Sequence, residues 1–489
     1  MSNIVIVKTD KYYYPKADFR PSRKYPEYLF DEISKKDNHV YDMIRKWFLM
    51  MKLDIKNYWT YSWNPLWKFI EKWNKVVVKP NLVMDYNPTW EGVECLYTQP
   101  SIVAAIVDYV IIALKWSWEI VIWDAPMQEC NFEKLISESW YDKLIEFYHK
   151  KLKWTNIKIK LEDFRELKTI CAFWAYKQNI VDDTLWIVVD LGNDSEFSNL
   201  TEEQFKNLRI TNYDPSILNS HHNAFKNEYY INKTILEADA IINVPKPKTH
   251  RKAWVTIALK NLIWINARKE YLPHHMNWSK IDNKWDEYLL PSYIKRILDK
   301  IIDIRNKLVN QKKHFLSRLL FIFRHGLTMI VKFFSKDKFF EWSRYGNNTI
   351  SKTIIDLNKI VRYADKNWKM SDKIQRNYFI VADMIISWEK EWPIAPSPKN
   401  VWMIAMWENP IYFDETIWTL MWAKMESNPT ILCAKKSMKK WKLYNENDKI
   451  FITSNDKNLD SKTIKQISKK EILYFEPSEW WRKVFLKNN

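Results

Sequence analysis

The stretch PKPKTH at residues 245–250 places two lysines and a histidine close together, directly after the apolar run ADAIINV. Lys246 and Lys248 supply ammonium groups that can bind phosphate or carboxylate, and the imidazole of His250 can act as an acid or base near neutral pH. Ten residues after this histidine the chain adds Lys260 and then Asn261. We interpret this region as part of a site for a small anionic molecule, although a histidine at this place could also simply cap a turn.

Polar side chains also follow three other short apolar runs. Lys79 and Asn81 close the run VVVKPN, and Asp124 follows the run EIVI. Asp383 follows the run YFIVA. Taken singly, each would more commonly be a solvated turn residue. In open α/β sheets, however, ligands bind outside the carboxyl ends of the strands, so these residues together with PKPKTH predict one site.

The elements that must position these residues form a β-α-β pattern. The strand VVVK is followed by the helix SIVAAIVDYVIIALK, which Pro100 opens, and then by the strand EIVI. A strand, a helix and a strand joined by short turns give two parallel strands with a right-handed crossover. Further strands are expected at residues 186–190, 238–244, 378–382 and 401–406. The predicted fold class is therefore α/β, a parallel sheet flanked by helices, with a helical insertion and an irregular C-terminal segment.

The chain is too long for one ordinary core, so we divide it by composition and pattern. The predicted parts are an entry segment (1–74), an α/β core (75–290), a basic amphipathic helical insertion (291–345), and a continuation of the core with the C-terminal segment (346–489).

Tryptophan and glycine have unusual frequencies in this chain. It contains 28 Trp and 4 Gly in 489 residues, whereas glycine alone normally makes up about 7% of a protein. In KWSWEIVIWDAPMQ (115–128), tryptophans stand where a chain leaves a helix and a strand, which are glycine positions. We interpret most Trp as Gly in the cell, through a code that reads UGA as glycine. The alternative is a natively Trp-rich protein with an aromatic binding surface.

The recoding hypothesis makes structural predictions. Trp116, Trp118, Trp388 and Trp392 should lie at turns or strand ends, with positive φ, unusual exposure or crowding against the backbone. Trp63, which matches a true Trp in a motif below, and Trp481, which we also interpret as a true Trp, should be buried in apolar surroundings.

Charge and cysteine content limit the class of protein. The net charge of +18 would favour nucleic acid or an anionic membrane as partner, but part of it reflects the abundant Lys and Asn of an AT-rich genome. Four scattered cysteines without a CxxC pair argue against an iron–sulfur cluster and suit a reducing cytoplasm; they are Cys95, Cys130, Cys171 and Cys433. The N-terminus lacks the features of a signal peptide. We expect a cytoplasmic location.

The segment LSRLLFIFRHGLTMIVKFF (316–334) is apolar but carries internal cations. Central charges are costly in a spanning helix, so we expect an amphipathic helix instead. Residues 311–338 contain seven Lys or Arg and one Asp. Such a helix could lie on an anionic membrane surface, which would make the protein membrane-peripheral. A helical hairpin packed on the core is the alternative.

With Gly at most Trp positions, the chain resembles the uncharacterised domain-of-unknown-function family 362 from about residue 57 to residue 481. NYWTYSWNPL resembles the family's N-x-G-T-x-x-W-N-P-L, with Trp59 in place of Gly and Trp63 as Trp. The most specific piece is ADAIINVPKPKTHRKAWVTIALKNLIWIN. It resembles A-D-x-x-I-N-x-P-K-x-K-T-H followed by G-x-T-x-x-x-K-N-x-x-G. TQP, IVIWDAPMQ and ISWEKEWPIAPSPK also match. Because the family's activity is unsettled, the resemblance implies only an architecture and a site position.

A weaker resemblance is to the parallel α/β lobe of lactate racemases, which use a nickel-pincer nucleotide. His250 and Lys260 have the His-x9-Lys spacing of that lobe, and His274 and His275 follow. The resemblance implies a cofactor tethered at the lysine and a later histidine at the metal, because imidazole suits nickel. Binding of an anion without a metal stays open as an alternative.

These considerations give one set of candidate residues and several candidate functions. The favoured function is an enzyme that binds a carboxylate or phosphate, with racemase- or isomerase-like proton transfer as one reaction. The alternatives are non-catalytic anion binding, peripheral membrane binding, and single-stranded nucleic-acid binding through stacked aromatic rings, although nucleic acid loses support if most Trp are Gly. The candidate catalytic residues are His250, Lys260 and Asp124; the candidate substrate-binding residues are Lys79, Asn81, Lys246, Lys248 and Asn261; the candidate metal ligands are His274 and His275.

Overall fold

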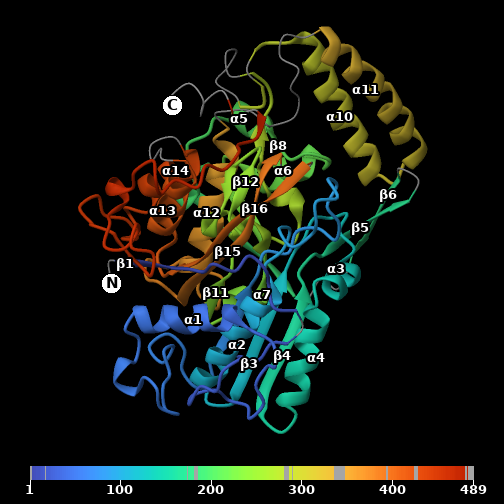
Figure 1. The fold of residues 1–489 in the computed structure, drawn as a ribbon. Coiled ribbons are helices and arrows are strands. Elements are labelled where there is room, and N and C mark those ends of the chain that lie inside the picture. Colours follow the sequence, from blue (N-terminus) through green and yellow to red (C-terminus); the bar gives the residue numbers. More distant parts are fainter. Residues whose placement is uncertain are drawn as a thin grey trace.

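The computed structural model describes residues 3–16, 18–172, 175–180, 185–279, 286–288, 290–334, 347–391, 395–422, 428–479 and 482. A ten-stranded sheet runs through the middle of the molecule, and helices cover both of its faces (Figure 1). The strands along its main path follow the order β17-β1-β16-β15-β11-β2-β3-β4, while β12 and β13 extend it beside β15.

The centre of the sheet is parallel, as the β-α-β pattern predicts. β2 (Lys75–Lys79) pairs in parallel with β3 (Ser117–Asp124) and with β11 (Ala240–Asn243). β11 also pairs in parallel with β15 (Asn377–Glu391), and β3 with β4 (Asn156–Asp163). β2, β3 and β11 are mostly continuous apolar runs because both of their faces are buried, whereas β4, at the edge of the sheet, alternates between buried and exposed residues.

The predicted fold class, a parallel sheet flanked by helices, is confirmed, and the strands beyond β15 add antiparallel pairs to it. β16 (Ala395–Trp407) runs antiparallel to β15, and β1 (Asn3–Lys8) runs antiparallel to β16. β17 (Phe451–Ser454) then pairs in parallel with β1. β15 and β16 are long and joined by a short connection, and such a connection suits an antiparallel pair, not a crossover.

Two strands differ from the sequence reading. β1 lies in residues that the pattern assigned to an entry segment, where its single short apolar run gave little signal. β7 (Trp186–Asp190) is a strand as expected, but it belongs to a separate three-stranded antiparallel sheet with β10 (Lys226–Asn232) and β9 (His222–Asn223).

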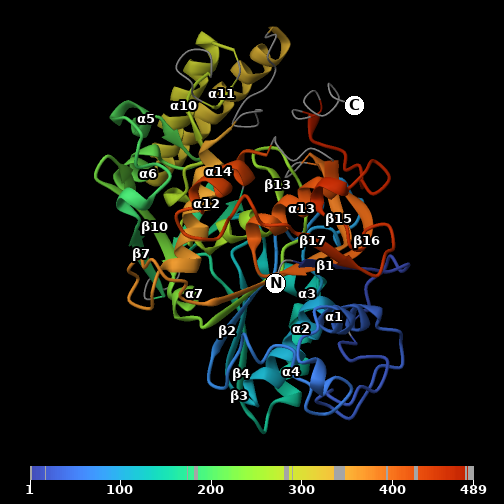
Figure 2. The ribbon, with the colours of Figure 1, turned by 90° about the vertical axis from the view of Figure 1, so that its left-hand side faces the viewer.

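The sheet separates two hydrophobic cores. Val76 and Val78 of β2 belong to the core that includes residues of α1 (His39–Met50), α2 (Pro100–Leu114) and α4 (Tyr141–Lys151). Val77, which points the other way, belongs to the core that contains α12 (Thr349–Tyr363), α13 (Pro410–Trp422) and α14 (Pro429–Ser437). Figure 2 shows the first group of helices low in the molecule and the second group above the sheet.

Shorter elements complete the described chain. The remaining strands are β5 (Leu167–Ala172), β6 (Ala175–Ile180), β8 (Leu208–Arg209), β12 (Lys248–His250), β13 (Trp254–Thr256) and β14 (His275–Met276). The remaining short helices are α3 (Phe132–Glu138), α5 (Glu202–Lys206), α6 (Pro215–His221), α7 (Lys233–Glu237) and α8 (Ala258–Asn261).

The turn from α2 into β3 has the backbone that the tryptophan argument predicts. Pro100 stands in the first turn of α2, where its missing N–H is harmless. The helix ends at Lys115 in the left-handed conformation, with φ of 50°. Trp116 and Trp118 follow with φ of 64° and 88°, and both indoles are exposed. These are conformations that glycine adopts readily and that a bulky residue avoids.

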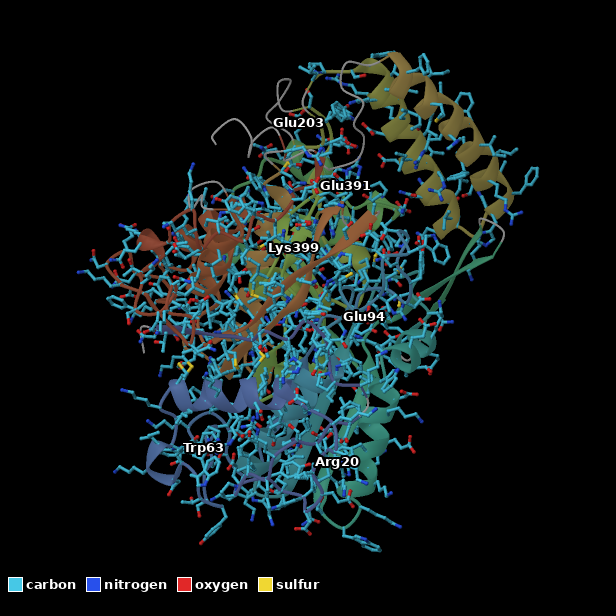
Figure 3. The ribbon with its side chains drawn as sticks, in the orientation of Figure 1. Arg20, Trp63, Glu94, Glu203, Glu391 and Lys399 are labelled. Carbon is cyan, nitrogen blue, oxygen red and sulfur yellow. The ribbon has the colours of Figure 1, made fainter. Side chains whose placement is uncertain are left out.

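Left-handed backbone is concentrated at tryptophan throughout the described residues. Nine of the eighteen non-glycine residues with positive φ are Trp: Trp59, Trp73, Trp90, Trp116, Trp118, Trp140, Trp254, Trp368 and Trp402. Three of the six tryptophans named in the predictions behave as expected. Besides Trp116 and Trp118, Trp63 is fully buried near α1, and its Nε1 donates to Leu53 O at 3.0 Å (Figure 3).

The prediction for Trp388 is wrong. This residue lies within β15 without positive φ, is fully buried, and donates from Nε1 to Thr249 O at 3.1 Å. The indole is accommodated because β12 pairs beside this end of β15, so the ring fills space between the two strands and Lys248. The predictions for Trp392 and Trp481 lie outside the described residues.

The predicted helical insertion contains two antiparallel helices, α10 (Tyr293–Asn310) and α11 (His314–Phe334). In Figures 1 and 2 this hairpin stands at one corner of the molecule, away from the central sheet. None of the described helices is long and apolar enough to span a membrane.

Candidate functional site

The predicted site residues at the ends of β2 and β3 form a buried ion pair. Lys79 Nζ lies 2.6 Å from Asp124 Oδ1 and also donates to Pro80 O at 2.8 Å. The other carboxylate oxygen of Asp124 accepts from Leu82 N at 2.6 Å, and Oδ1 accepts from Ala125 N at 2.7 Å. Both side chains are fully buried, so this pair fixes the two strand ends relative to each other.

A chain of amide side chains connects this pair to β11 and α8. Asn81 Nδ2 donates to Asn261 Oδ1 at 2.7 Å, and Asn261 Nδ2 donates to Asn243 Oδ1 at 2.7 Å. Asn243 stands opposite Lys79 in the register of β11 and β2. Lys248 Nζ donates to the Asn81 side-chain oxygen. Residues that are more than 160 positions apart in sequence therefore meet here through direct hydrogen bonds.

Lys246 has a second buried carboxylate as its partner. Its Nζ lies 2.8 Å from Asp383 Oδ2 and 3.0 Å from the Tyr14 hydroxyl. That hydroxyl donates to Asp383 Oδ1 at 2.6 Å. The structure thus buries the predicted residues at these strand ends in neighbouring hydrogen-bonded groups: Lys79 with Asp124, Asn81 with Lys248 and Asn261, and Lys246 with Asp383.

His250 and Lys260 lie beside these groups. His250 Nδ1 accepts hydrogen bonds from Lys252 N at 3.0 Å and Ala253 N at 3.2 Å, so the neutral ring carries its proton on Nε2. Burial and the nearby charge of Lys260 hold the pKa of His250 well below its ordinary value. The imidazole therefore stays neutral and presents an N–H donor.

Lys260 differs from the other predicted catalytic residues in its lack of polar partners. It is buried, and among the described residues no hydrogen bond or ion pair to its ammonium is observed; the closest aromatic contact is the Trp264 ring, 5.8 Å from Nζ to the centroid. Burial alone lowers the pKa of Lys260 to about 7. An amine with this pKa is half deprotonated at neutral pH, which suits a base or a nucleophile.

A cavity of about 210 Å³ opens outside the carboxyl end of β3. Of the residues predicted for the site, His274 lines it; Lys260 does not, although Trp264, whose ring lies 5.8 Å from Lys260 Nζ, does. The residues after β3 form one wall of it, and a face of α10 forms another. Its polar lining is mainly basic, with Glu129 as its single carboxylate. The lining residues are Met127, Gln128, Glu129, Ile210, Thr211, Asn212, Tyr213, Lys252, Trp264, Lys269, His274, Arg305, Asn306 and Val309.

Lys269 connects the cavity to the buried groups at the strand ends. Its Nζ donates to Ala125 O at 3.4 Å and lies 3.9 Å from the centroid of the Trp264 ring. Burial holds the pKa of Lys269 well below its ordinary value, against the attraction of Asp124. Like Lys260, it forms no ion pair with a carboxylate in the part of the chain that the structure describes.

The sequence reasoning missed three cations of the cavity: Lys252, Lys269 and Arg305. Lys252 follows the PKPKTH stretch by two residues, so a longer basic window would have included it. Lys269 and Arg305 had no comparable signal, because Lys269 lies in an irregular segment and Arg305 lies on α10, in the predicted insertion.

The two histidines predicted as metal ligands, His274 and His275, have different surroundings. His274 lines the cavity, and its Nδ1 lies 2.7 Å from Leu272 O. His275 lies on β14, with Nε2 3.9 Å from Glu287 Oε1. Within the described ranges, no group of three or more His, Cys, Asp or Glu side chains could hold a metal ion. The nickel cofactor that the weaker resemblance implies needs only one such histidine beside a tethering lysine, so it stays a prediction.

Electrostatically, the cavity region carries an excess of positive charge. Two of the buried carboxylates, Asp124 and Asp383, are each already paired with a lysine, and a third, Asp414, accepts from the backbone of α8 at Ala258 N and Leu259 N. Lys260 and Lys269 remain beside them without a carboxylate partner among the described residues. An anion in the cavity would supply the missing negative charge, and the neutral imidazoles could add hydrogen bonds to it.

Comparison with known protein families gives one match. Residues 180–419 match the model of the family described as Domain of unknown function (DUF362). This span contains β11, the PKPKTH stretch, Lys260 and the cavity residues from α10, whereas Lys79, Asn81 and Asp124 lie before it. Comparison with curated proteins and with solved structures gives no match.

Proposed function

We propose that this protein binds a small anionic molecule, a carboxylate or a phosphate, in the cavity at the carboxyl end of β3. The observation that carries the proposal is the charge of the lining: Lys252, Lys269 and Arg305 stand around about 210 Å³ of space with only one carboxylate, Glu129. The position agrees with the general rule that open α/β sheets bind ligands beyond the carboxyl ends of their strands.

The buried amines give a physical reason for an anion at this place. A buried ammonium without a paired charge costs several kcal/mol, so the group gives up its proton or acquires an anion. Burial lowers the pKa of Lys260 to about 7 and also holds the pKa of Lys269 well below its ordinary value, so both amines meet this condition. A bound carboxylate or phosphate would stabilise their charged forms and raise both pKa values.

The same groups could support proton transfer, as in a racemase or isomerase. With glycine at position 264, Lys260 would face the cavity and act as the base beside the bound anion, because its amine is partly deprotonated at neutral pH. His250 would orient the substrate by donating from Nε2, since its Nδ1 is occupied by two backbone N–H groups. Asp124 would position Lys79 and would not act as a base, since both of its oxygens already accept hydrogen bonds.

Our proposal includes glycine at most of the tryptophan positions. The support is the left-handed backbone at nine tryptophans, among them Trp254, which stands at the first Gly of the pattern G-x-T-x-x-x-K-N-x-x-G. Trp264 stands at the last Gly of that pattern, and its ring is the surface against which Lys260 and Lys269 lie. Glycine at this position would remove the indole and enlarge the cavity next to both amines.

Titration of the purified protein with inorganic phosphate and with acetate, followed by calorimetry, tests the anion site. Lys269→Met should weaken binding about tenfold or more, since it removes a charge-assisted contact. The matched control is Lys457→Met, which changes an exposed lysine far from the cavity in sequence. If neither anion binds, or if both variants bind as tightly as the parent, the cavity is not an anion site.

Sequencing the gene tests the recoding separately. UGA codons at Trp116, Trp118 and Trp264, with glycine found at these positions in peptides from the source cells, would support it. UGG codons at the same three positions would contradict it and leave the anion-site test unaffected.

A further inference from the structure

We propose that the outer face of α11 docks on the surface of an anionic lipid bilayer. The starting observation is the exposure of large apolar side chains along most of this helix. Those with more than a third of their surface exposed are Phe315, Leu316, Leu319, Ile322, Phe323, Met329, Ile330 and Phe333.

These side chains form one continuous stripe. At 3.6 residues per turn, their positions repeat at spacings of three, four and seven, which places them on a single side of the helix. Among the residues of α11 whose side chains the structure describes, Ser317 and Val331 are buried, and they fall on the opposite side. The apolar stripe therefore faces away from the body of the protein, and side chains project outward from α11 in Figure 3.

The positive charge around the apolar stripe indicates which surface would bind it. From residue 311 to residue 334 the sequence contains five Lys or Arg and no Asp or Glu. Arg318 and His325 are exposed and flank one edge of the stripe. An apolar face with Arg318 at its edge, in a segment that carries only positive charge, fits a bilayer with anionic headgroups, where the rings enter the acyl boundary and the cations meet the phosphates.

A second copy of this chain fits the face less well. In a symmetric dimer the same stripe meets itself, so the basic edge of each α11 would lie near the other basic edge without an acidic residue in the segment to compensate. Spanning the bilayer is also disfavoured, because α11 does not reach the length and hydrophobicity that a spanning helix requires. The geometry points to a helix that lies in the plane of the membrane surface.

Co-sedimentation with vesicles tests this inference. The full-length protein is mixed with vesicles of phosphatidylcholine alone or with about one third phosphatidylserine, a composition that gives a negative surface potential. We expect sedimentation with the anionic vesicles, little with the neutral ones, and a decrease of about tenfold or more in the bound fraction for L319Q/I322Q/F323Q. High salt should also weaken binding, because the headgroup attraction is screened.

Phe225→Gln is the matched control, since Phe225 is an exposed phenylalanine on another part of the surface. It should bind vesicles like the parent, and circular dichroism should show that the triple variant stays folded. Equal binding by the triple variant and the parent, or no binding of the parent to anionic vesicles, would overturn the inference. A dimer in sedimentation velocity that the triple variant abolishes, with no vesicle binding, would assign the face to a second copy. Phosphate titration of the triple variant should be unchanged, which separates this test from that of the anion site.

Discussion

Replacing Lys260 by methionine should make the protein more stable at neutral pH. The ammonium of this lysine is buried and has no hydrogen-bond or ion-pair partner among the described residues, so nothing offsets its loss of hydration. Methionine keeps an unbranched side chain of similar length without a charge. The substitution therefore removes a cost to folding and sacrifices no polar contact in the described part of the chain.

The magnitude follows from the pKa of Lys260, which burial lowers from 10.5 to about 7. Each unit of difference between folded and unfolded chain corresponds to about 1.4 kcal/mol, so the cost is about 5 kcal/mol below pH 7. The sign is that of a lysine with a lowered pKa: the unfolded chain binds the proton more tightly, so stability increases as the pH rises from 7 towards 10.5. The same relation gives about 4 kcal/mol at pH 7 and about 2 kcal/mol at pH 9.

Urea denaturation at pH 7 and pH 9 measures this difference. The gain in the unfolding midpoint for Lys260→Met over the parent should be roughly twice as large at pH 7 as at pH 9. Lys457→Met, which removes an exposed charge, should show little change at either pH. Saturating phosphate should reduce the gain at pH 7, since a bound anion stabilises the ammonium of the parent. A variant that is less stable than the parent at pH 7, or a gain that does not depend on pH, would refute the reasoning.

Three further outcomes are expected. Asp124→Asn should lower the free energy of unfolding by about 3–5 kcal/mol, measured by urea denaturation, because it leaves the ammonium of Lys79 buried without its carboxylate. Trp118→Gly should raise the free energy of unfolding by about 1 kcal/mol, because it relieves a left-handed backbone at φ of 88°; no change would argue that the native residue tolerates this conformation. Phosphate should raise the thermal midpoint of the parent and have a smaller effect on Lys269→Met, as followed by differential scanning fluorimetry.

The centre of the fold could be predicted from sequence because its signals are local. The runs VVVK and EIVI are short and apolar, and a helix with Pro100 at its start separates them. This local pattern is sufficient to predict that the two strands pair in parallel, as they do. The edge of the sheet could not be predicted in this way. β1 pairs with β16 and β17, which lie some 400 residues later in the chain, and a six-residue apolar run does not indicate such distant partners.

Part of the candidate site could likewise be predicted from sequence, and part could not. Residues directly after strands, such as Lys79 and Lys246, could be named because the topology of a parallel sheet fixes where strand ends gather. Their partners could not: Tyr14, which donates to Asp383, comes from the N-terminal segment. Arg305 reaches the cavity from α10, a helix whose sequence pattern indicates amphipathicity and not a binding role. Long-range packing decides these contacts.

Trp264 links the tryptophan hypothesis to the proposed anion site. Trp264 contacts both amines that lack a carboxylate partner in the described chain, with its ring centroid 3.9 Å from Lys269 Nζ and 5.8 Å from Lys260 Nζ. An indole face attracts a cation only weakly compared with an anion, so the ring fills the space without offsetting the burial of two ammonium groups. A glycine at position 264 would leave room for an anion, which could offset the burial of both ammonium groups. With glycine at position 264, the proposed function therefore predicts that both amines would be open to a bound carboxylate or phosphate.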